Sequence, residues 1–471
     1  MKMLKKYNIT LLAVAVVITM ALPSCRKALF EEPVNSLDPG AAFESKERVE
    51  AAAVGMYNQL QNREFFGGRI LIYADIRGVD AFPNAQFGNM YQFNTVTSSD
   101  GTTALAYEGG YRTIGEVNLF LKNLAGATGI VDPEKATQYT GEGEFIRALS
   151  YFYLVNLWAQ PYNFTPGATH LGVPIVLTST NDVFNPVNNV PRNTVAQVYA
   201  QIEKDLLSAE AKLPVSYDDP GFSDNARATK GAAQALLARL YLYKGDYLKA
   251  NVYADKVIAS PAGYAMNATP LVAFRTPTTK ESIFSVAHNG GDNPNTNNAL
   301  GQHYGFDKRG DITVGTDYAG LMDITKDLRY TTLIVKTSKG LLYSAKYQGS
   351  SDWAPVLRYS ETLLTKAEAL ANLATGVDPV AVGLLNDVRL RSHASVLAPA
   401  TKADLITAIL TERRIELAFE GHGILDFLRT GRGIPAHGNI LAQAYGSNFV
   451  VLPIPRHETD INKNLVQNPG Y

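Results

Sequence analysis

Three acidic side chains near the C-terminal end of the sequence could do proton chemistry. Glu412, Glu416 and Glu420 recur at i, i+4 spacing, and arginines lie between them. Carboxylates held together on one helix face could act as general acid and base. Carboxylates interleaved with arginines more commonly form salt bridges that stabilise the fold. The pattern favours such a structural network, with Arg358, Arg389 or Arg429 as partners.

A second acidic pair, Asp75 and Asp80, could be imagined as the two carboxylates of a glycosidase. Both lie on one irregular segment, and nothing in the sequence fixes their separation. The sequence has no HExxH, GxSxG, Walker-type or paired-cysteine motif, and its seven histidines lack the spacing of metal ligands. We therefore expect no enzyme activity, no cofactor and no metal site.

The only cysteine of the chain, Cys25, follows an apolar run from Ile9 to Leu22 that is preceded by lysines. This run of about 14 residues is shorter than the roughly 20 that span a bilayer as a helix, and it is typical of a signal peptide. A lone cysteine at the cut resembles the lipobox of bacterial lipoproteins, whose thiol is acylated. The alternative is an ordinary secretory signal followed by an incidental free thiol.

These features predict a signal peptide at residues 1–24, lipid attachment such as palmitate at Cys25, and a tether over residues 25–40. Each buried methylene adds about 0.8 kcal/mol, and several acyl chains together anchor a protein stably to a membrane. With no second cysteine the mature chain forms no internal disulfide, so its stability must come from buried apolar area.

The overall charge excludes one class of partner. Lys and Arg number 43 and Asp and Glu 44, so the net charge is -1 and no basic field would hold nucleic acid. Charged residues make up only 18%, whereas the chain has 25 Tyr, 19 Phe and 38 Gly. Such a composition favours neutral hydrogen-bonding and stacking surfaces, which suit uncharged ligands.

A helical hairpin is predicted over residues 229–260. Ala238, Tyr241, Ala250, Ala254 and Val257 fall at the spacings of a tetratricopeptide repeat, with a turn near Gly245. Ala238 and Ala250 would let the two helices approach closely. Similar pairs are predicted at 357–393, at 48–61 with 107–124, and at 142–158 with 194–213, and a further helix at 404–419.

Three long inserts interrupt these helices, near residues 62–106, 159–192 and 267–354. They are rich in Gly, Pro, Asn and aromatic residues and show no helical periodicity. The third insert also contains short strand-like runs at 283–287 and 333–335. Long loops in a compact domain are usually functional or disordered, and their aromatics argue against disorder. We therefore expect one mainly α domain over residues 41–471, in which irregular loops project from a helical scaffold.

Several motifs spread along the chain resemble those of the SusD/RagB family of Bacteroidetes outer-membrane lipoproteins. The most specific is Glu412–His422 followed by Leu425–Arg429, similar to the family's ER-x-x-E-x-x-x-EG-x-R/H…D-L-x-R signature. Matching pieces also occur at Gly141–Ala148 with Tyr151-Phe152, at Arg358-Tyr359 before Ala367-Glu368-Ala369, at Leu452–Pro455, and at Gln467–Tyr471.

The resemblance implies a lipid-anchored protein on the outer membrane, facing the cell exterior, with four tetratricopeptide-like units. Such a protein closes over a SusC-like TonB-dependent transporter, captures nutrient oligomers and performs no chemistry. In most family members the nutrient is an oligosaccharide, and in some, as in RagB-like members, it is a peptide. Two other functions remain open: an adaptor that holds a peptide on the concave helical face, and a surface glycosidase.

A sugar presents flat apolar faces edged by hydroxyls, so its binding surface needs aromatic rings beside Asp, Asn or Arg. The resemblance places the family's ligand loops in the first and the late insert. For any one aromatic there, packing of the loop onto the scaffold is about as plausible as ligand contact. The candidate ligand-binding residues are Asp75, Arg77, Asp80, Phe82, Asn84, Phe87, Tyr91 and Phe93 in the first insert, and His303, Tyr304, Phe306 and Trp353 in the late one.

Overall fold

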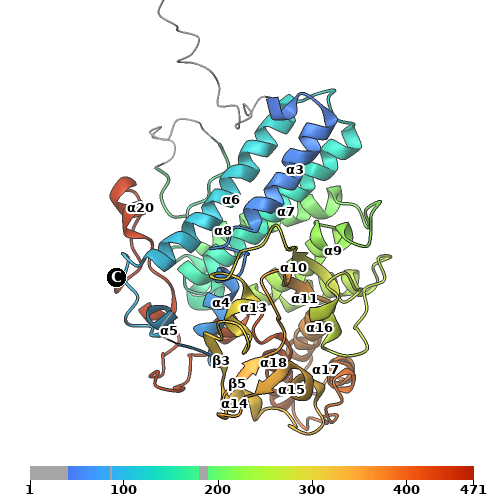
Figure 1. Ribbon diagram of the computed structural model, residues 1–471, viewed down its shortest axis with the longest axis vertical. Helices are drawn as coiled ribbons and strands as arrows, with labels where there is room; N and C mark the ends of the chain where they lie inside the picture. Colours follow the sequence, from blue (N-terminus) through green and yellow to red (C-terminus); the bar gives the residue numbers. More distant parts are fainter. Residues whose placement is uncertain (1–40, 85–86, 180–188) are drawn as a thin grey trace, which may run out of the picture.

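The computed structural model describes residues 41–84, 87–179 and 189–471. The predicted signal peptide, Cys25 and the tether lie outside these described residues. Long helices dominate the rest, as the sequence predicted (Figure 1). They are α3 (Lys46–Leu60), α6 (Gly101–Gly126), α7 (Pro133–Trp158), α8 (Val195–Lys212), α10 (Lys230–Lys244), α11 (Tyr247–Ile258), α16 (Tyr359–Leu373), α17 (Pro379–Arg391) and α18 (Lys402–Leu417).

All four predicted helix pairs form, because α3 packs on α6, α7 on α8, α10 on α11 and α16 on α17. In the α10–α11 hairpin, Gly245 ends the first helix with a left-handed backbone (φ 72°), and Asp246 caps the next by accepting from the Lys249 N–H. Ala238 and Ala250 are buried between the two helices. Figure 1 shows α3, α6 and α7 side by side at one end of the molecule, with α16, α17 and α18 near the other.

Local sequence explains where two of these helices begin. Thr194 and Gln197 form a reciprocal capping box at the start of α8, and Thr401 and Asp404 form another at the start of α18. Each box satisfies backbone N–H groups that would otherwise lack a partner in the first helical turn.

The first insert contains a helix that the sequence did not reveal. Helix α4 (Arg69–Ile76) is buried along its whole length, so it has no polar face and shows no amphipathic period. Its side chains join the main hydrophobic core, which extends from Val49 in α3 to Leu465 near the C-terminus. A second, smaller core lies between α16, α17 and α18.

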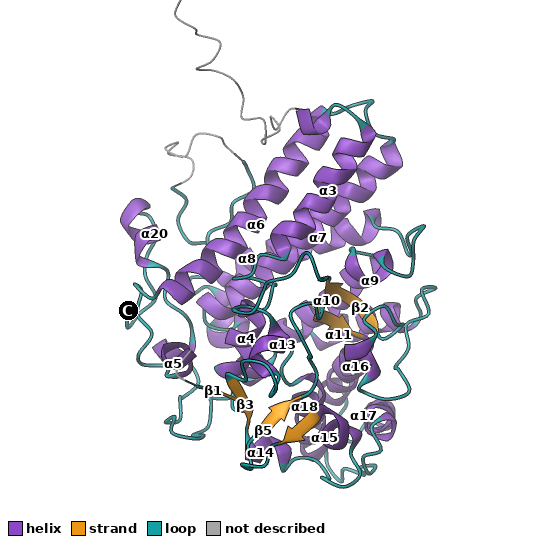
Figure 2. Ribbon diagram, in the orientation of Figure 1, coloured by secondary structure: helices purple, strands orange, loops and turns teal. Residues whose placement is uncertain are grey.

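The strands form three separate two-stranded antiparallel ribbons, shown in orange in Figure 2 where they are in view. The expected runs at 283–287 and 333–335 correspond to β2 and β4, each shifted by one residue at the start. The pairs are β1 (Ala81–Pro83) with β3 (Ile312–Val314), β2 (Ser282–Val286) with β6 (Ala354–Arg358), and β4 (Ile334–Lys336) with β5 (Leu342–Ser344).

Short helices complete the inserts and the C-terminal segment, and no helix in the described part of the chain is long and apolar enough to cross a membrane. The α-helical ones are α5 (Gly88–Tyr91), α9 (Ser223–Ala226), α12 (Val272–Arg275), α13 (Leu300–Tyr304), α14 (Thr316–Ala319), α15 (Leu328–Leu333), α19 (Gly423–Arg429) and α20 (Arg456–Ile461). The 3₁₀ turns are η1 (Ala41–Phe43), η3 (Tyr162–Phe164), η4 (Pro166–Ala168) and η6 (Asn448–Val450).

Candidate functional site

Most side chains predicted to contact ligand in the first insert are buried. Asp75 accepts hydrogen bonds from the Gly421 and Gly423 N–H groups at 3.0 and 3.2 Å and from the Tyr304 hydroxyl at 3.1 Å. Arg77 donates to the Met90 and Phe449 carbonyls and lies over the Phe93 ring. These contacts are made within the protein, so they hold the insert on the scaffold.

The remaining aromatics of the first insert pack in the same way. Phe82 is half-buried, and its ring and the buried Tyr91 ring each meet His437 edge-on. Phe87 is buried between the Arg69 guanidinium and the His303 ring. These rings thus pack against other groups of the protein.

The late insert divides into interior and exposed residues. His303 is buried, with its ring nitrogens on Asp311 and the Asn297 carbonyl, and Tyr304 is buried beside Asp75. Phe306 is exposed and Trp353 is half-buried; in the first insert, Asn84 is exposed as well.

The predicted position of the ligand platform is therefore corrected. The insert folds inward because it carries α4 and its own cluster of rings, which together fill the space beside α13. The residues assigned to the interior instead of the platform are Asp75, Arg77, Asp80, Phe87, Tyr91, Phe93, His303 and Tyr304.

The acidic residues of α18 and its end form the predicted salt-bridged network. Glu412 binds Arg329 and Arg389, and Glu416 binds Arg329, Arg358 and Arg391. Glu420 accepts from Arg358 and Lys346. Arg429, a third predicted partner, pairs with Glu368 and Asp426 instead. All three glutamates are buried, so this network joins α18 to the inserts and is closed to a substrate.

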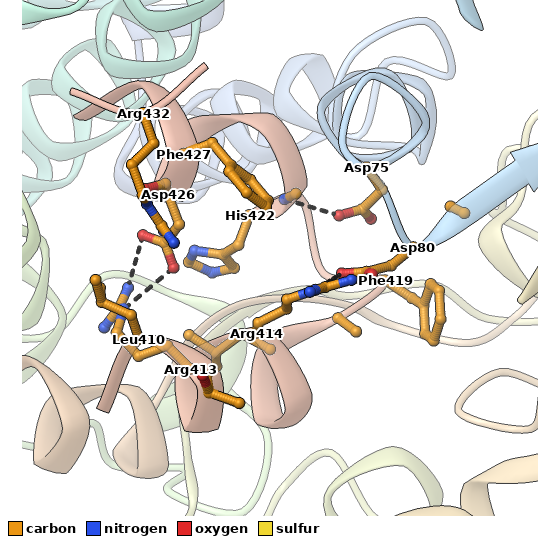
Figure 3. Close-up of a pocket in the computed structure, with 15 residues that line it drawn as sticks. Asp75, Asp80, Leu410, Arg413, Arg414, Phe419, His422, Asp426, Phe427 and Arg432 are labelled. Atoms are coloured by element: carbon orange, nitrogen blue, oxygen red, sulfur yellow. Dashed lines mark hydrogen bonds and ion pairs between the residues drawn. The ribbon is translucent and has the colours of Figure 1, made fainter. Parts of the chain in front are cut away.

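A small charged cavity of about 90 Å³ lies beside this network (Figure 3). Asp80 lines it and is paired with Arg414 at 2.9 Å, and His422 extends its ring between Asp426 and Arg414. Burial raises the pKa of Asp75 to about 7, although the two glycine N–H groups oppose the shift. Asp75 and Asp80 are thus each engaged by their own protein partners, unlike an exposed glycosidase pair.

A surface hollow lies between α3 and the chain that follows β2. It measures about 630 Å³ and continues into a second hollow of about 290 Å³, with which it shares Asn58, Gln61, His288 and Asp292. We call the two together the His288 groove. Its size falls within the range typical of ligand sites.

The lining of the His288 groove combines an apolar set of residues with an amide-rich set. The apolar set comprises Ala51, Val54, Leu60, Phe222, Ala226, Phe284, Val286 and Ala287. The polar set comprises Asn58, Gln61, Asn62, Arg63, His288, Asn289, Asp292, Asn293 and Asn295.

The amide-rich loop is held in place by its own contacts and by α3. The Asn289 side chain accepts from the Gly291 and Asp292 N–H groups, both at 2.8 Å. Just after β2, the Ala287 carbonyl accepts from the side chain of Gln61, which directly follows α3. The loop is thus fixed at its base, and its amide side chains lie beside the groove.

An exposed ring stands at the edge of the groove. Phe222, just before α9, is 49% exposed and meets Trp353 in a T-shaped contact with ring centroids 5.3 Å apart. The Trp353 indole donates to the His288 carbonyl at 3.0 Å. Of the predicted ligand residues, Trp353 therefore lies next to the groove, and it positions two groove residues.

His288 is the least satisfied polar side chain of the groove. It is only 6% exposed, and neither ring nitrogen has a hydrogen-bond partner in the protein. Burial lowers its pKa to about 4, so the ring is neutral at pH 7. A neutral imidazole offers one donor and one acceptor. A buried donor or acceptor without a hydrogen-bond partner costs about 1–3 kcal/mol. A ligand that reached either ring nitrogen would remove this cost.

Sequence reasoning missed these groove residues for identifiable reasons. Phe222, His288 and Asn58 are far apart in the chain and meet only after folding. The one sequence feature that could have indicated the groove is the run Asn-Gly-Gly-Asp-Asn-Pro-Asn, which directly follows a predicted strand and a histidine. No group of His, Cys, Asp and Glu side chains suited to a metal ion occurs within residues 41–84, 87–179 and 189–471.

Two family models match separate parts of the chain. The first, described as "Starch-binding associating with outer membrane", matches residues 30–242, and the second, described as "SusD family", matches residues 284–471. The SusD-like protein P2 of Formosa agariphila is 27% identical over 99% of this chain and 100% of its own length.

Solved structures share the fold. A SusD superfamily protein from Bacteroides fragilis has a TM-score of 0.79 and 29% identity, covering 90% of this chain and 99% of its own. A laminarin-binding SusD-like protein has a TM-score of 0.73 at 22% identity, covering 91% of this chain and 100% of its own. The similarity thus extends over nearly the whole described fold.

Proposed function

We propose that this chain, which belongs to the SusD/RagB family, binds a neutral oligosaccharide in the His288 groove and performs no chemistry on it. The observation that carries the proposal is the unpartnered, buried His288 ring in a groove lined by both apolar and amide-bearing side chains. Sugars need apolar contact for their ring faces and hydrogen bonds for their hydroxyls, and the lining supplies both.

The charge of the groove supports an uncharged ligand. Arg227, which lines the groove, is bound by the buried Glu142 carboxylate at 2.8 Å. Amides and the neutral His288 ring supply most other polar groups of the lining. Asn84 and Phe306 are exposed elsewhere on the inserts, and we retain them as further candidate contacts.

The proposed role extends to delivery. We infer that the protein is held at the outer membrane through acylated Cys25, faces the cell exterior, and passes its ligand to a SusC-like TonB-dependent transporter. The family description of association with the outer membrane and the apolar run before Cys25 support this placement. Co-purification of a large β-barrel protein with the tagged, membrane-extracted chain would test the partnership, and recovery of the chain alone would argue against it.

A substitution that fills the groove tests the site directly. Gly55 lies in α3 on the groove wall, and a side chain added there would meet nothing within 4 Å. We expect Gly55→Leu to weaken oligosaccharide binding at least about tenfold, or about 1.4 kcal/mol. The matched control is Gly115→Leu, also within a helix and in open space but outside the groove.

The edge ring gives a second test with its own control. Phe222→Ala removes an exposed ring from the groove, whereas Phe164→Ala removes a similarly exposed ring that packs on His170 and Tyr445. We expect only the first change to weaken binding in isothermal titration calorimetry. Equal loss in both variants, or none in either, would place the site elsewhere.

Titration with a panel of ligands separates the proposed function from its alternatives. We expect at least one oligosaccharide of the maltose, laminarin, cellulose or chitin type to bind saturably and to be recovered intact. Binding of short peptides alone would support the peptide-capturing or adaptor function, because the same amides could bond a peptide backbone. Recovery of shortened sugars would indicate a glycosidase.

A further inference from the structure

The His288 groove has an apolar compartment that plain sugar rings would fill poorly. Phe284, Val286 and Leu60 lie at its base and are themselves almost fully buried. Val54 of α3, which is 49% exposed, and Ala226 border the same space. Hydroxyl groups placed there would lose water without gaining hydrogen bonds, which costs roughly 1–3 kcal/mol each. The compartment instead suits a methyl or other small apolar group.

Polar groups able to bond an amide lie directly beside this compartment. His288 belongs to both hollows, and its two ring nitrogens have no partner. Asn58 and Gln61 stand on the α3 side of the same boundary. A neutral imidazole can accept from an amide N–H through one nitrogen or donate to an amide carbonyl through the other.

We infer that the groove selects sugar units carrying an N-acetyl group, with the methyl in the apolar compartment and the amide bonded by His288 and the neighbouring side-chain amides. This inference rests on the proposed function, since it names the class of sugar that the groove binds. The Trp353 indole donates to the His288 carbonyl, which fixes the backbone that carries the ring.

Chitin-type and cellulose-type oligosaccharides provide a matched pair of probes, because they share the same β-1,4-linked backbone and differ in the acetamido group. We expect calorimetry with the full mature chain to give at least about tenfold tighter binding of the N-acetylated tetrasaccharide than of cellotetraose. The de-N-acetylated tetrasaccharide should bind as weakly as cellotetraose or more weakly.

The possible results separate this inference from the proposed function. Equal or tighter binding of cellotetraose, or binding of malto- or laminari-oligosaccharides alone, overturns the N-acetyl preference and leaves oligosaccharide capture intact. Binding of peptides without any oligosaccharide overturns both.

Two variants assign the preference to the compartment. His288→Leu removes the polar atoms and should reduce the ratio of affinities for the acetylated and plain tetrasaccharides to near one. Because His288 is buried, Val54→Asp provides a variant at an exposed site, and it should lower the affinity for the acetylated sugar at least about tenfold. Val252→Asp, on the exposed face of α11, is its matched control and should bind normally. A preserved preference in both groove variants would overturn the assignment.

Discussion

At the scale of single residues, Asp75 connects three distant segments. Its carboxyl group on α4 accepts from the Gly421 and Gly423 N–H groups at the start of α19 and from the Tyr304 hydroxyl of α13. The group is buried, and burial raises its pKa to about 7. An aspartate in an unfolded chain has a pKa of about 3.9. The folded protein therefore binds the Asp75 proton more tightly than the unfolded chain does.

We predict that Asp75→Asn gains stability relative to the unmodified protein as the pH rises from 5 to 8. Between the two pKa values the unfolded carboxyl loses its proton first, so the wild-type free energy of unfolding falls as the pH rises toward 7. Asparagine does not titrate and escapes this penalty. Denaturant unfolding of both proteins at pH 5 and pH 8 measures the effect, and a constant difference between them would contradict it.

Glu416 is expected to be among the most sensitive positions of the chain. Burial alone would raise its pKa, but Arg391, Arg358 and Arg329 together lower it, so the group stays ionised in the folded state. Glu416→Gln would leave these guanidinium groups under-compensated in the interior, which typically costs about 3–5 kcal/mol. Denaturant titration measures this loss.

The control for that change is Glu44→Gln. Glu44 pairs with Arg48 at the surface, and both side chains are well exposed. Exposed pairs contribute little to stability, so this variant should unfold at nearly the wild-type denaturant concentration. Similar losses for both variants would mean that burial of the Glu416 network does not govern its contribution.

At the scale of elements, the helices were predictable where one face meets the core and a turn residue marks the end. The α10–α11 hairpin has both signals, small residues at the crossing and Gly245-Asp246 at the turn. Helix α4 has neither, because it is buried on all sides and leaves no periodic trace. The sequence thus predicted the helical scaffold but not how the first insert packs against it.

The candidate site was less predictable than the frame. Composition correctly indicated rings and amides on the inserts, but a ring in a sequence carries no mark of whether it faces inward. Phe87 and Phe93 became part of the core, whereas Phe222, outside the predicted inserts, stayed exposed at the groove. The partners of Glu412 and Glu416 were easier to predict, since their i, i+4 spacing already demanded nearby cations.

Two glycines should respond to the same substitution with opposite signs. Gly245 has a left-handed backbone, so Gly245→Ala should lower the free energy of unfolding by about 1 kcal/mol. Gly55 sits inside α3 with open space around it, so Gly55→Ala should raise that free energy by up to about 1 kcal/mol. Denaturant midpoints measure both changes, and shifts of the same sign would contradict the assignment.

At the scale of the whole molecule, the two segments matched by separate family models pack against each other. Helix α10, most of which lies in the earlier segment, packs against α16 of the later one, and α4 packs against α19. The main core draws residues from both parts. We therefore attribute the two matches to one structural unit.

The anchor is predicted at this scale as well. Cys25→Ala should move the protein from the membrane fraction to the soluble fraction and abolish incorporation of labelled palmitate, because the thiol is the proposed site of acylation. Oligosaccharide affinity should not change, since the groove is built entirely from other residues. Continued membrane association of the variant would contradict a lipid anchor at this position.

The amide-rich loop begins where the buried strand β2 ends, and Gly290 and Gly291 within it are exposed, with room for a side chain. Residues 289 to 293 are mostly exposed and bond mainly to one another, so changes there would disturb the rest of the fold little. Related proteins could therefore come to bind different ligands through sequence changes in this short stretch alone. Replacing the loop after β2 with a loop from another protein could likewise change the ligand specificity.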